Sequence, residues 1–181
     1  MVALSIHHSE EHSICAPKWC VIFTNLSNVI FIEFYSKKNF PPGKWINEPD
    51  LCVWEHQLPC LAIRDMGMGV WKGFVAVKEG HPLFGKPVEE MLKQPIMMDV
   101  FLSVYGGLSG AGRLPPKYKE FAKDYWWIGI ETSHGGDLMP LLKLDDSDPN
   151  MAKMISTQTY KDFSFIRKET NKLAKMISKL K

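Results

Sequence analysis

The C-terminal segment has the pattern that most restricts how this chain can fold. Six side chains recur there at alternating spacings of three and four residues: Phe163, Ile166, Thr170, Leu173, Ile177 and Leu180. Four lysines and one glutamate lie between them on the expected surface, so the segment is predicted to be an amphipathic helix. A basic helix of this kind could also lie on a membrane surface or behave like a calmodulin target. We expect it instead to dock its apolar stripe on another layer of the protein.

Short runs of apolar and β-branched residues predict the layer that this helix covers. Residues 59–64 and 71–78 have the composition of strands. Between them lie residues 65–69, whose two glycines suit a turn that needs positive φ. The two strands are therefore predicted to form a hairpin.

Further elements are expected on both sides of this hairpin. Residues 98–105 and 125–130 are predicted to be strands, and residues 117–123 could form a short helix. Residues 20–35 are rich in Val, Ile and Phe around a polar quartet, which indicates two short strands joined by a turn. The predicted fold class is α+β: a small antiparallel or mixed sheet of four to six strands with the C-terminal amphipathic helix packed on one face.

Chain length and one helix-breaking segment set the expected domain organisation. A chain of 181 residues is long enough for one domain with a substantial core. The run Phe40-Pro41-Pro42-Gly43 interrupts regular structure. We therefore expect an N-terminal extension, residues 1–44, which could form a hairpin, followed by a single α+β domain, residues 45–181.

Charge and hydropathy argue against several classes of protein. The 22 basic and 20 acidic residues give a formal net charge of +2, too small for the basic surface of a dedicated nucleic-acid binder, although local patches can exist. The most apolar stretch, residues 20–34, is shorter than the roughly 20 residues that a membrane helix needs, and it contains polar side chains. No export signal precedes it. We expect a soluble, cytoplasmic protein without a membrane partner.

The cysteines agree with a reducing compartment. None of them forms the C-x-x-C pair that commonly holds zinc, so free thiols are expected. Their even number leaves disulfides open as an alternative. The four cysteines are Cys15, Cys20, Cys52 and Cys60.

Polar or glycine-rich loops follow three of the predicted strands, at residues 79–82, 105–109 and 131–137. Loops on a rigid scaffold are where binding and catalytic groups concentrate. Arg64 could add a cation that steadies an anion. The candidate ligand-binding residues are Arg64, His81, Tyr105, Gly106, Gly107, Gly135 and Gly136.

The loop around His134 has the strongest catalytic pattern. A histidine can hold or move a proton near neutral pH, and Glu131 or Asp137 could orient its other ring nitrogen. The neighbouring glycines, Gly135 and Gly136, would let backbone N–H groups approach an anion. The candidate catalytic residues are thus His134, Glu131 and Asp137. The same residues also suit an ordinary tight turn.

Other chemistries have weaker patterns. His81, His134 and a carboxylate would form a metal ligand set only if the fold brought separate loops together, so no metal is predicted and no cofactor can be named. The Gly106-Gly107 pair lacks the pattern of a phosphate-binding loop, and no Gly-x-Ser-x-Gly elbow of a hydrolase occurs. Adjacent Trp126 and Trp127 should face opposite sides of a strand; an exposed one could stack on a base or sugar, although a second packed layer is the simpler interpretation.

A series of short motifs runs along the chain in a fixed order: Trp45–Asp50, Pro59–Arg64, Gly73–Val77, Gly80–Gly85, Gly106–Ser109, Trp126–Ile130, His134 and Gly136–Asp137. This order resembles an uncharacterised family of small proteins from tailed-phage and related bacterial genomes. The resemblance covers about three quarters of the chain and leaves residues 1–44 outside. It implies an accessory protein of phage or mobile-element type. Where that family usually has histidine and aspartate, this chain has Tyr105 and Glu131.

Two classes of function follow from the sequence. The first is a protein without enzymatic activity that binds a small polar or nucleotide-like ligand, or a host protein, through the loops near His81, Gly106 and His134. The second is a hydrolase or phosphodiesterase in which His134 acts as general acid or base. The binding protein is favoured, because enzymes of the second class usually have a denser cluster of ionisable groups.

Overall fold

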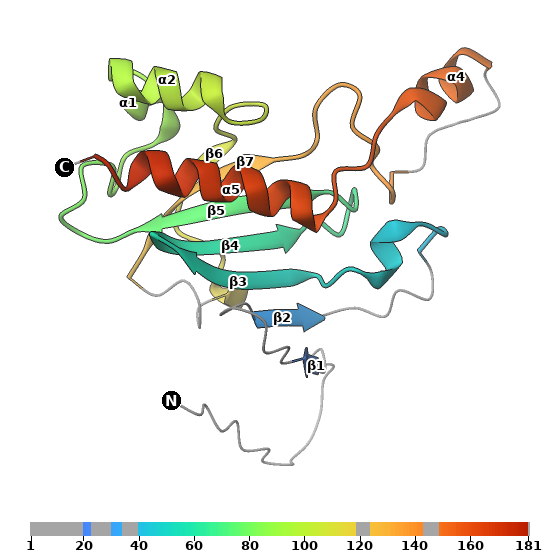
Figure 1. Cartoon of the computed structure of the whole chain (residues 1–181), viewed down its shortest axis with the longest axis horizontal. Coiled ribbons are helices and arrows are strands. Elements are labelled where there is room, and N and C mark those ends of the chain that lie inside the picture. The colour runs from blue at the N-terminus through green and yellow to red at the C-terminus, as the bar shows by residue number, and fades with distance from the viewer. Residues whose placement is uncertain (1–19, 23–29, 34–39, 119–123, 143–148, 181) are drawn as a thin grey trace.

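The computed structural model describes residues 20–22, 30–33, 40–118, 124–142 and 149–180. Its centre is one antiparallel sheet with the strand order β1-β2-β3-β4-β5-β7-β6 (Figure 1). The seven strands exceed the four to six expected. Their bounds are β1 Cys20–Ile22, β2 Ile30–Glu33, β3 Leu51–His56, β4 Leu58–Arg64, β5 Trp71–Val77, β6 Gly110–Gly112 and β7 Trp126–Glu131.

The predicted hairpin is confirmed as β4 and β5, which pair antiparallel from Cys60 opposite Val75 to Arg64 opposite Trp71. The turn between them is held by Asp65, whose Oδ1 accepts hydrogen bonds from Gly67 N at 2.9 Å and from Met68 N at 3.2 Å. Strand β7 then pairs with the other edge of β5. These central strands form the platform for the rest of the molecule.

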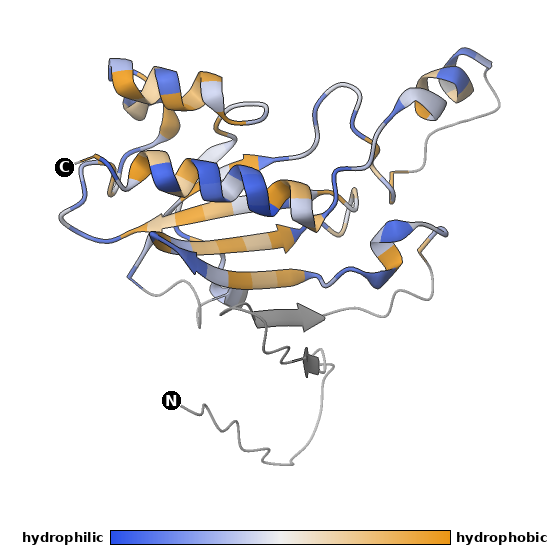
Figure 2. Cartoon of the chain, in the orientation of Figure 1, coloured by the Kyte–Doolittle hydropathy of each residue, from blue (hydrophilic) through white to orange (hydrophobic). Residues whose placement is uncertain are grey.

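The helical elements all lie outside the sheet. The C-terminal amphipathic helix is confirmed as α5, which crosses β3, β4 and β5 on one face (Figure 1). Figure 2 shows hydrophobic residues along the central strands and an alternation of hydrophobic and hydrophilic residues along α5. The helical bounds are α1 Val88–Met91, α2 Pro95–Ser103, α4 Pro149–Thr157 and α5 Phe163–Ile177, with short 3-10 turns at η2 Lys44–Asn47 and η3 Pro116–Tyr118.

Helix α5 begins and packs for identifiable reasons. Asp162 caps it by accepting a hydrogen bond from Phe165 N at 2.9 Å. Its apolar stripe, including Ile166 and Leu173, is buried against the sheet. Gly73 on β5 allows the close approach, because a Cβ at that position would lie 2.1 Å from Thr170 Oγ1.

Both faces of the central sheet are covered. The α5 face holds the larger core, and the opposite face holds a smaller one that includes Tyr118 and Trp127. Trp127 is only 2% exposed there, whereas Trp126 packs beside the larger core and donates from Nε1 to Lys86 O at 2.9 Å. The two tryptophans therefore serve packed layers on opposite faces of β7.

The strand predicted at residues 98–105 is wrong, because residues 95–103 form helix α2. Pro95 occupies the first turn, where the missing N–H is not needed. Met97 and Val100 are buried at helical spacing, but apolar residues also occupy the other faces, so the sequence has no clear period. Of the short helix expected at residues 117–123, only residues 117 and 118 are described, and they belong to η3.

The expected N-terminal extension, residues 1–44, lies mostly outside the described residues. Its described strands β1 and β2 pair antiparallel, and β2 pairs with β3 of the main sheet. Among the cysteines, Cys52 and Cys60 are buried free thiols, and burial raises the pKa of Cys60 to about 12. Within the described ranges, no helix has the length and apolar character required to cross a bilayer.

Candidate functional site

Two of the predicted loops meet at Asp137. Its Oδ1 accepts a hydrogen bond from the Tyr105 hydroxyl at 2.6 Å, and its Oδ2 accepts one from the His134 backbone N–H at 3.0 Å. The Asp137 residue is 1% exposed. Both carboxylate oxygens are thus occupied by donors from the protein itself, which leaves this carboxylate poorly placed to accept a proton from a substrate.

The ring of His134 lies directly on Gly106. A Cβ added at Gly106 would be 1.7 Å from His134 Nε2, and the backbone there has φ +65°, so glycine is required on both grounds. The Nε2 atom is buried and has no hydrogen-bond partner in the described part of the chain. The ring also meets Tyr105 edge to face, with 5.3 Å between ring centroids. Proton transfer through Nε2 has no open path in this arrangement.

A lysine closes the side of the cluster that faces α5. Lys161 Nζ lies 3.9 Å from Asp137 Oδ1 and above the rings of Tyr105 and Phe165, at 5.6 and 5.2 Å from their centroids. Burial, together with the hydrogen bond to Asp137, raises the pKa of Tyr105 to about 12. Tyr105 therefore stays a neutral hydroxyl donor at physiological pH. We call Tyr105, Gly106, His134, Asp137 and Lys161 the loop cluster.

The loop cluster is tied to α5 and its preceding segment. Leu138 N donates to Thr159 O at 3.1 Å, and Thr159 N donates to Gly136 O at 2.9 Å. On the other side, the Tyr105 backbone N–H donates to Glu169 Oε2 on α5 at 3.0 Å. These bonds join three segments that are distant in sequence, so the loop cluster fixes the position of α5.

Two of the predicted site residues lie in other contacts. Glu131 Oε2 is 3.9 Å from Lys72 Nζ on the neighbouring strand. Arg64 is 2% exposed and belongs to a separate buried network, in which it donates to Glu48 Oε2 at 2.7 Å and to the Tyr160 hydroxyl at 2.9 Å. Neither side chain joins His134.

His81 lies near the opposite end of α5. Its Nδ1 accepts a hydrogen bond from Leu83 N at 3.2 Å, and its Nε2 is 3.4 Å from Ile177 O. Burial lowers the pKa of its imidazole. Phe165, beside the loop cluster, and Ile177 are about 18 Å apart along the helix. The two histidines therefore form no common site, and the described residues contain no group of three or more His, Cys, Asp or Glu placed to hold a metal ion.

The remaining predicted glycines differ in their surroundings. Gly107 is buried, with φ +80°, and faces the ring of Phe101. Gly135 and Gly136 are exposed, and nothing lies within 4 Å of the Cβ positions at either one. The turn at these two glycines is open to solvent. However, His134 and Asp137, which were expected to act beside it, make their contacts within the loop cluster.

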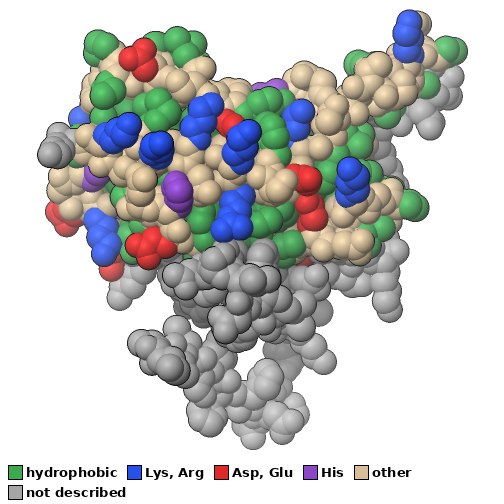
Figure 3. Space-filling model, viewed as in Figure 1, with side chains coloured by type: hydrophobic (Ala, Val, Ile, Leu, Met, Phe, Trp, Pro, Cys, Tyr) green, Lys and Arg blue, Asp and Glu red, His purple; other side chains and the backbone are tan. Residues whose placement is uncertain are grey.

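The sequence interpretation placed the lysines of the C-terminal helix on its surface but did not favour a binding role for them. Between residues 163 and 180, five residues are exposed, and four of them are lysines; the fifth is Ser164. We call these four the lysine stripe: Lys168, Lys172, Lys175 and Lys179. Basic side chains gather across this face of the molecule (Figure 3). Their spacings of four, three and four and their place outside the apolar stripe are visible in the sequence, but the scarcity of carboxylates around them is not.

The lysine stripe is only weakly neutralised. Lys172 Nζ lies 3.7 Å from Glu169 Oε2, and this carboxylate already accepts the Tyr105 N–H. The other three lysines have no carboxylate within 4.0 Å among the described residues. Beside the stripe is an open groove of about 350 Å³, lined by Phe163, Ser164, Arg167, Lys168 and Asn171. The exposed side of α5 is therefore a cationic surface.

No family model, curated protein or solved structure matches this chain. The resemblance to the phage family therefore stays a prediction.

Proposed function

We propose that this protein is a binding protein without enzymatic activity, and that it holds an acidic partner protein along the lysine stripe of α5. One observation supports this most directly: the exposed residues of 163–180 are lysines with a single exception. Lysines at i and i+4 repel one another and destabilise an isolated helix. A partner carrying carboxylates would relieve that repulsion.

Simpler explanations account for part of the stripe. Cations near a helix C-terminus interact favourably with the macrodipole, which explains Lys175 and Lys179. Lys168 and Lys172 lie nearer the middle of the helix, where this effect has fallen away. An exposed charged face also keeps a helix soluble, but mixed charges would do so without the repulsion.

The loop cluster supports the binding class over the hydrolase class. The contacts of His134 Nε2 and Asp137 leave no adjacent acid and base facing solvent, and Glu131 lies with Lys72 instead. Its bonds instead hold α5 in place, because the Tyr105 N–H reaches Glu169. The loops expected to bind a ligand thus position the binding surface.

The test is the affinity for poly-glutamate at low salt, measured by calorimetry. Neutralising three stripe lysines in the variant K168Q/K175Q/K179Q should weaken binding. A surface ion pair contributes about 0.2–1 kcal/mol, so three of them predict a loss of about 0.6–3 kcal/mol, or roughly 3- to 150-fold. Lys172 is kept, because it also bonds the end of α2.

The matched control removes the same charge elsewhere. Lys44, Lys78 and Lys153 are exposed and lie outside α5 and the lysine stripe. The variant K44Q/K78Q/K153Q should bind poly-glutamate within about twofold of the parent. Equal losses in the two variants would show that net charge alone attracts the polymer, and no measurable binding to the parent protein would contradict the proposed function.

A further inference from the structure

Helix α2 exposes large apolar side chains to solvent. Ile96 is 51% exposed, Met98 41% and Leu102 73%. These are three of the five large hydrophobic residues that are exposed in the described chain, and they lie on one helix of nine residues. Figure 2 shows the hydrophobic colouring of this helix. Single exposed apolar residues are ordinary, but such a cluster marks an interaction surface.

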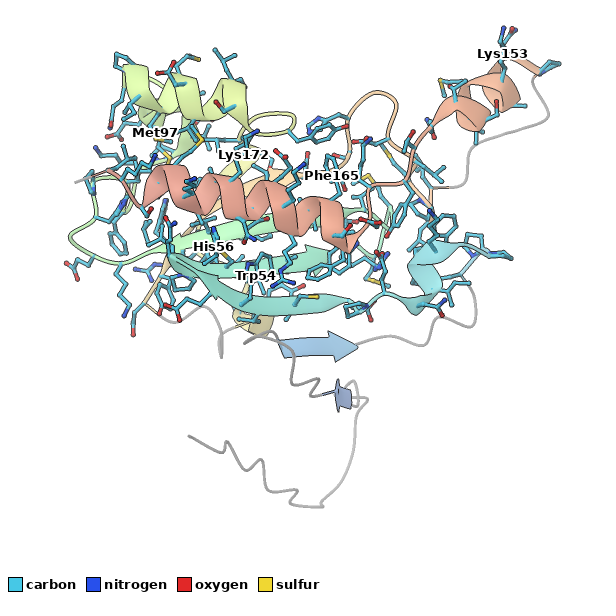
Figure 4. All side chains as sticks on the ribbon, viewed as in Figure 1. Trp54, His56, Met97, Lys153, Phe165 and Lys172 are labelled. Atoms are coloured by element: carbon cyan, nitrogen blue, oxygen red, sulfur yellow. The ribbon has the colours of Figure 1, made fainter. Side chains whose placement is uncertain are left out.

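The apolar face of α2 lies next to the lysine stripe. Lys172 Nζ donates to Ser103 O, the last residue of α2. Two residues later in the chain, the Tyr105 N–H donates to Glu169 of α5. Met97 and Val100, on the inner face of α2, share a core with Leu173. In Figure 4, the labels of Met97 and Lys172 mark this junction of the two helices.

We propose that α2 and α5 together form one docking surface, and that its occupant is an acidic amphipathic helix of a partner protein. The apolar side of the occupant would cover Met98 and Leu102, and its carboxylates would meet the lysine stripe. This inference rests on the proposed function for its charge and adds the apolar contact and the helical form of the partner.

The dimensions and spacing of the surface suit a helix. Lys168 and Lys175 are seven residues apart on α5, a distance of about 10 Å and two helical turns, and Lys179 follows in the turn after the helix. Met98 and Leu102 are one turn apart on α2, so they lie on one side of the helix. An amphipathic helix that docks on such a surface contacts it through apolar residues spaced three and four apart.

Acidic residues on α1 and α2 favour a protein as the partner over an anionic bilayer or a nucleic acid. Asp99 is exposed on α2, and Glu89 and Glu90 are exposed on α1. A phosphate-rich surface that covered α2 would come close to the carboxylate of Asp99, which would repel it. A protein partner can place cations or neutral side chains there and still supply carboxylates to the lysine stripe.

The experiment compares three synthetic peptides of about 18 residues, a length that supports helix formation. One is a leucine–glutamate peptide with leucine recurring every three and four positions; the second scrambles the same composition; the third replaces glutamate with lysine. Binding to the full chain is measured by fluorescence anisotropy. The amphipathic acidic peptide should bind at least about tenfold more tightly than its scrambled form, and the basic peptide should not bind.

Paired variants locate the apolar contact. M98Q/L102Q should remove the preference for the amphipathic over the scrambled peptide and leave the salt dependence intact. The control M154Q/L142Q changes the same residue types at sites 47% and 43% exposed, and it should keep that preference. Circular dichroism checks that both variants are folded.

The outcomes separate this inference from the function on which it rests. Equal binding of the two acidic peptides, still weakened in K168Q/K175Q/K179Q, overturns the docking of α2 and leaves the proposed function standing. Failure of every acidic peptide overturns both. Binding to vesicles rich in phosphatidylserine, or to duplex DNA, more tightly than to the amphipathic peptide overturns the choice of a protein partner.

Discussion

Replacing Arg64 by methionine removes the cation of a buried ion-pair network and keeps a side chain of similar length. Arg64 lies 2.7 Å from Glu48 Oε2 and 3.7 Å from Asp50 Oδ1, and its guanidinium is 4.6 Å from the Trp71 ring centroid. Arg64 and Asp50 are 2% and 1% exposed. Removing one partner of a buried pair costs about 3–5 kcal/mol, because the remaining charge stays in a desolvated site.

A second substitution, at Glu48, shows how much of the stability lost in R64M comes from the ion pair with Glu48. Glu48 also accepts hydrogen bonds from Trp71 Nε1 at 3.1 Å, from the Tyr160 hydroxyl at 2.5 Å and from Phe163 N at 2.7 Å. The variant E48Q removes the charge by replacing the carboxylate with an amide of the same shape. In the R64M background, E48Q should therefore cost less than it does alone, with a coupling of about 1–3 kcal/mol in a double-mutant cycle.

Urea denaturation followed by circular dichroism gives the free energies of unfolding. For a chain of this length, the expected loss in R64M corresponds to a fall of roughly 6–20 °C in the melting temperature. Arg113 supplies a control, because it is exposed and its guanidinium lies 5.9 Å from the Phe84 ring centroid; R113M should change stability by at most about 0.5 kcal/mol. A loss below about 1 kcal/mol in R64M would refute the view that this network holds residues 48–50 against the start of α5.

Two further changes probe how α5 is held. Asp162→Ala should lower the free energy of unfolding by about 1 kcal/mol at neutral pH, as expected for a lost N-cap. The hydrogen bond from Ser164 holds the pKa of Asp162 below 3.8, so this deficit should persist above pH 3.8 and vanish as the pH falls through the lowered pKa; urea titrations across that range test it. Gly73→Ala should cost about 1–3 kcal/mol by urea denaturation, since its Cβ would overlap Thr170. Gly110→Ala has open space and should be nearly neutral, so equal effects at the two glycines would contradict the packing argument.

The sequence predicts those parts of the fold in which local pattern and burial agree. In α5 the apolar positions recur every three or four residues, and in the structure Ile166, Leu173 and Ile177 are all fully or almost fully buried. In the β4–β5 hairpin, the glycine-containing turn and two apolar runs specify one arrangement. The C-terminal helix on an antiparallel sheet follows from these two signals alone.

Helix α2 shows where local pattern misleads. Its apolar residues occupy every side, so neither a period of two nor one of 3.6 stands out. Met97 and Val100 are buried in the main core, whereas Leu102 is 73% exposed, and nothing local distinguishes these roles. Which apolar side chain packs and which stays exposed depends on where α5 lies.

The role of the candidate site residues could not be predicted from the sequence for a related reason. Tyr105 and Asp137 are 32 residues apart, and each is a residue type that could bind a ligand or act in catalysis. Each side chain satisfies the hydrogen-bonding group of the other within the protein. Residues that looked catalytic in the sequence therefore have a structural role. By contrast, the lysines of α5 look like an ordinary solvated face in the sequence, but the fold brings few carboxylates to them.

The free energy available for binding therefore lies in groups that the fold leaves incompletely satisfied. A carboxylate such as Asp137, which already accepts two hydrogen bonds, gains little from a ligand and loses its present partners if one displaces them. Neighbouring lysines of the stripe repel one another, and exposed Leu102 orders water around its side chain. Both costs fall when an acidic, apolar surface covers them. The loop cluster has its polar groups satisfied and the adjoining helices do not, and this contrast supports our proposal that the loops fix the geometry while α2 and α5 bind the partner.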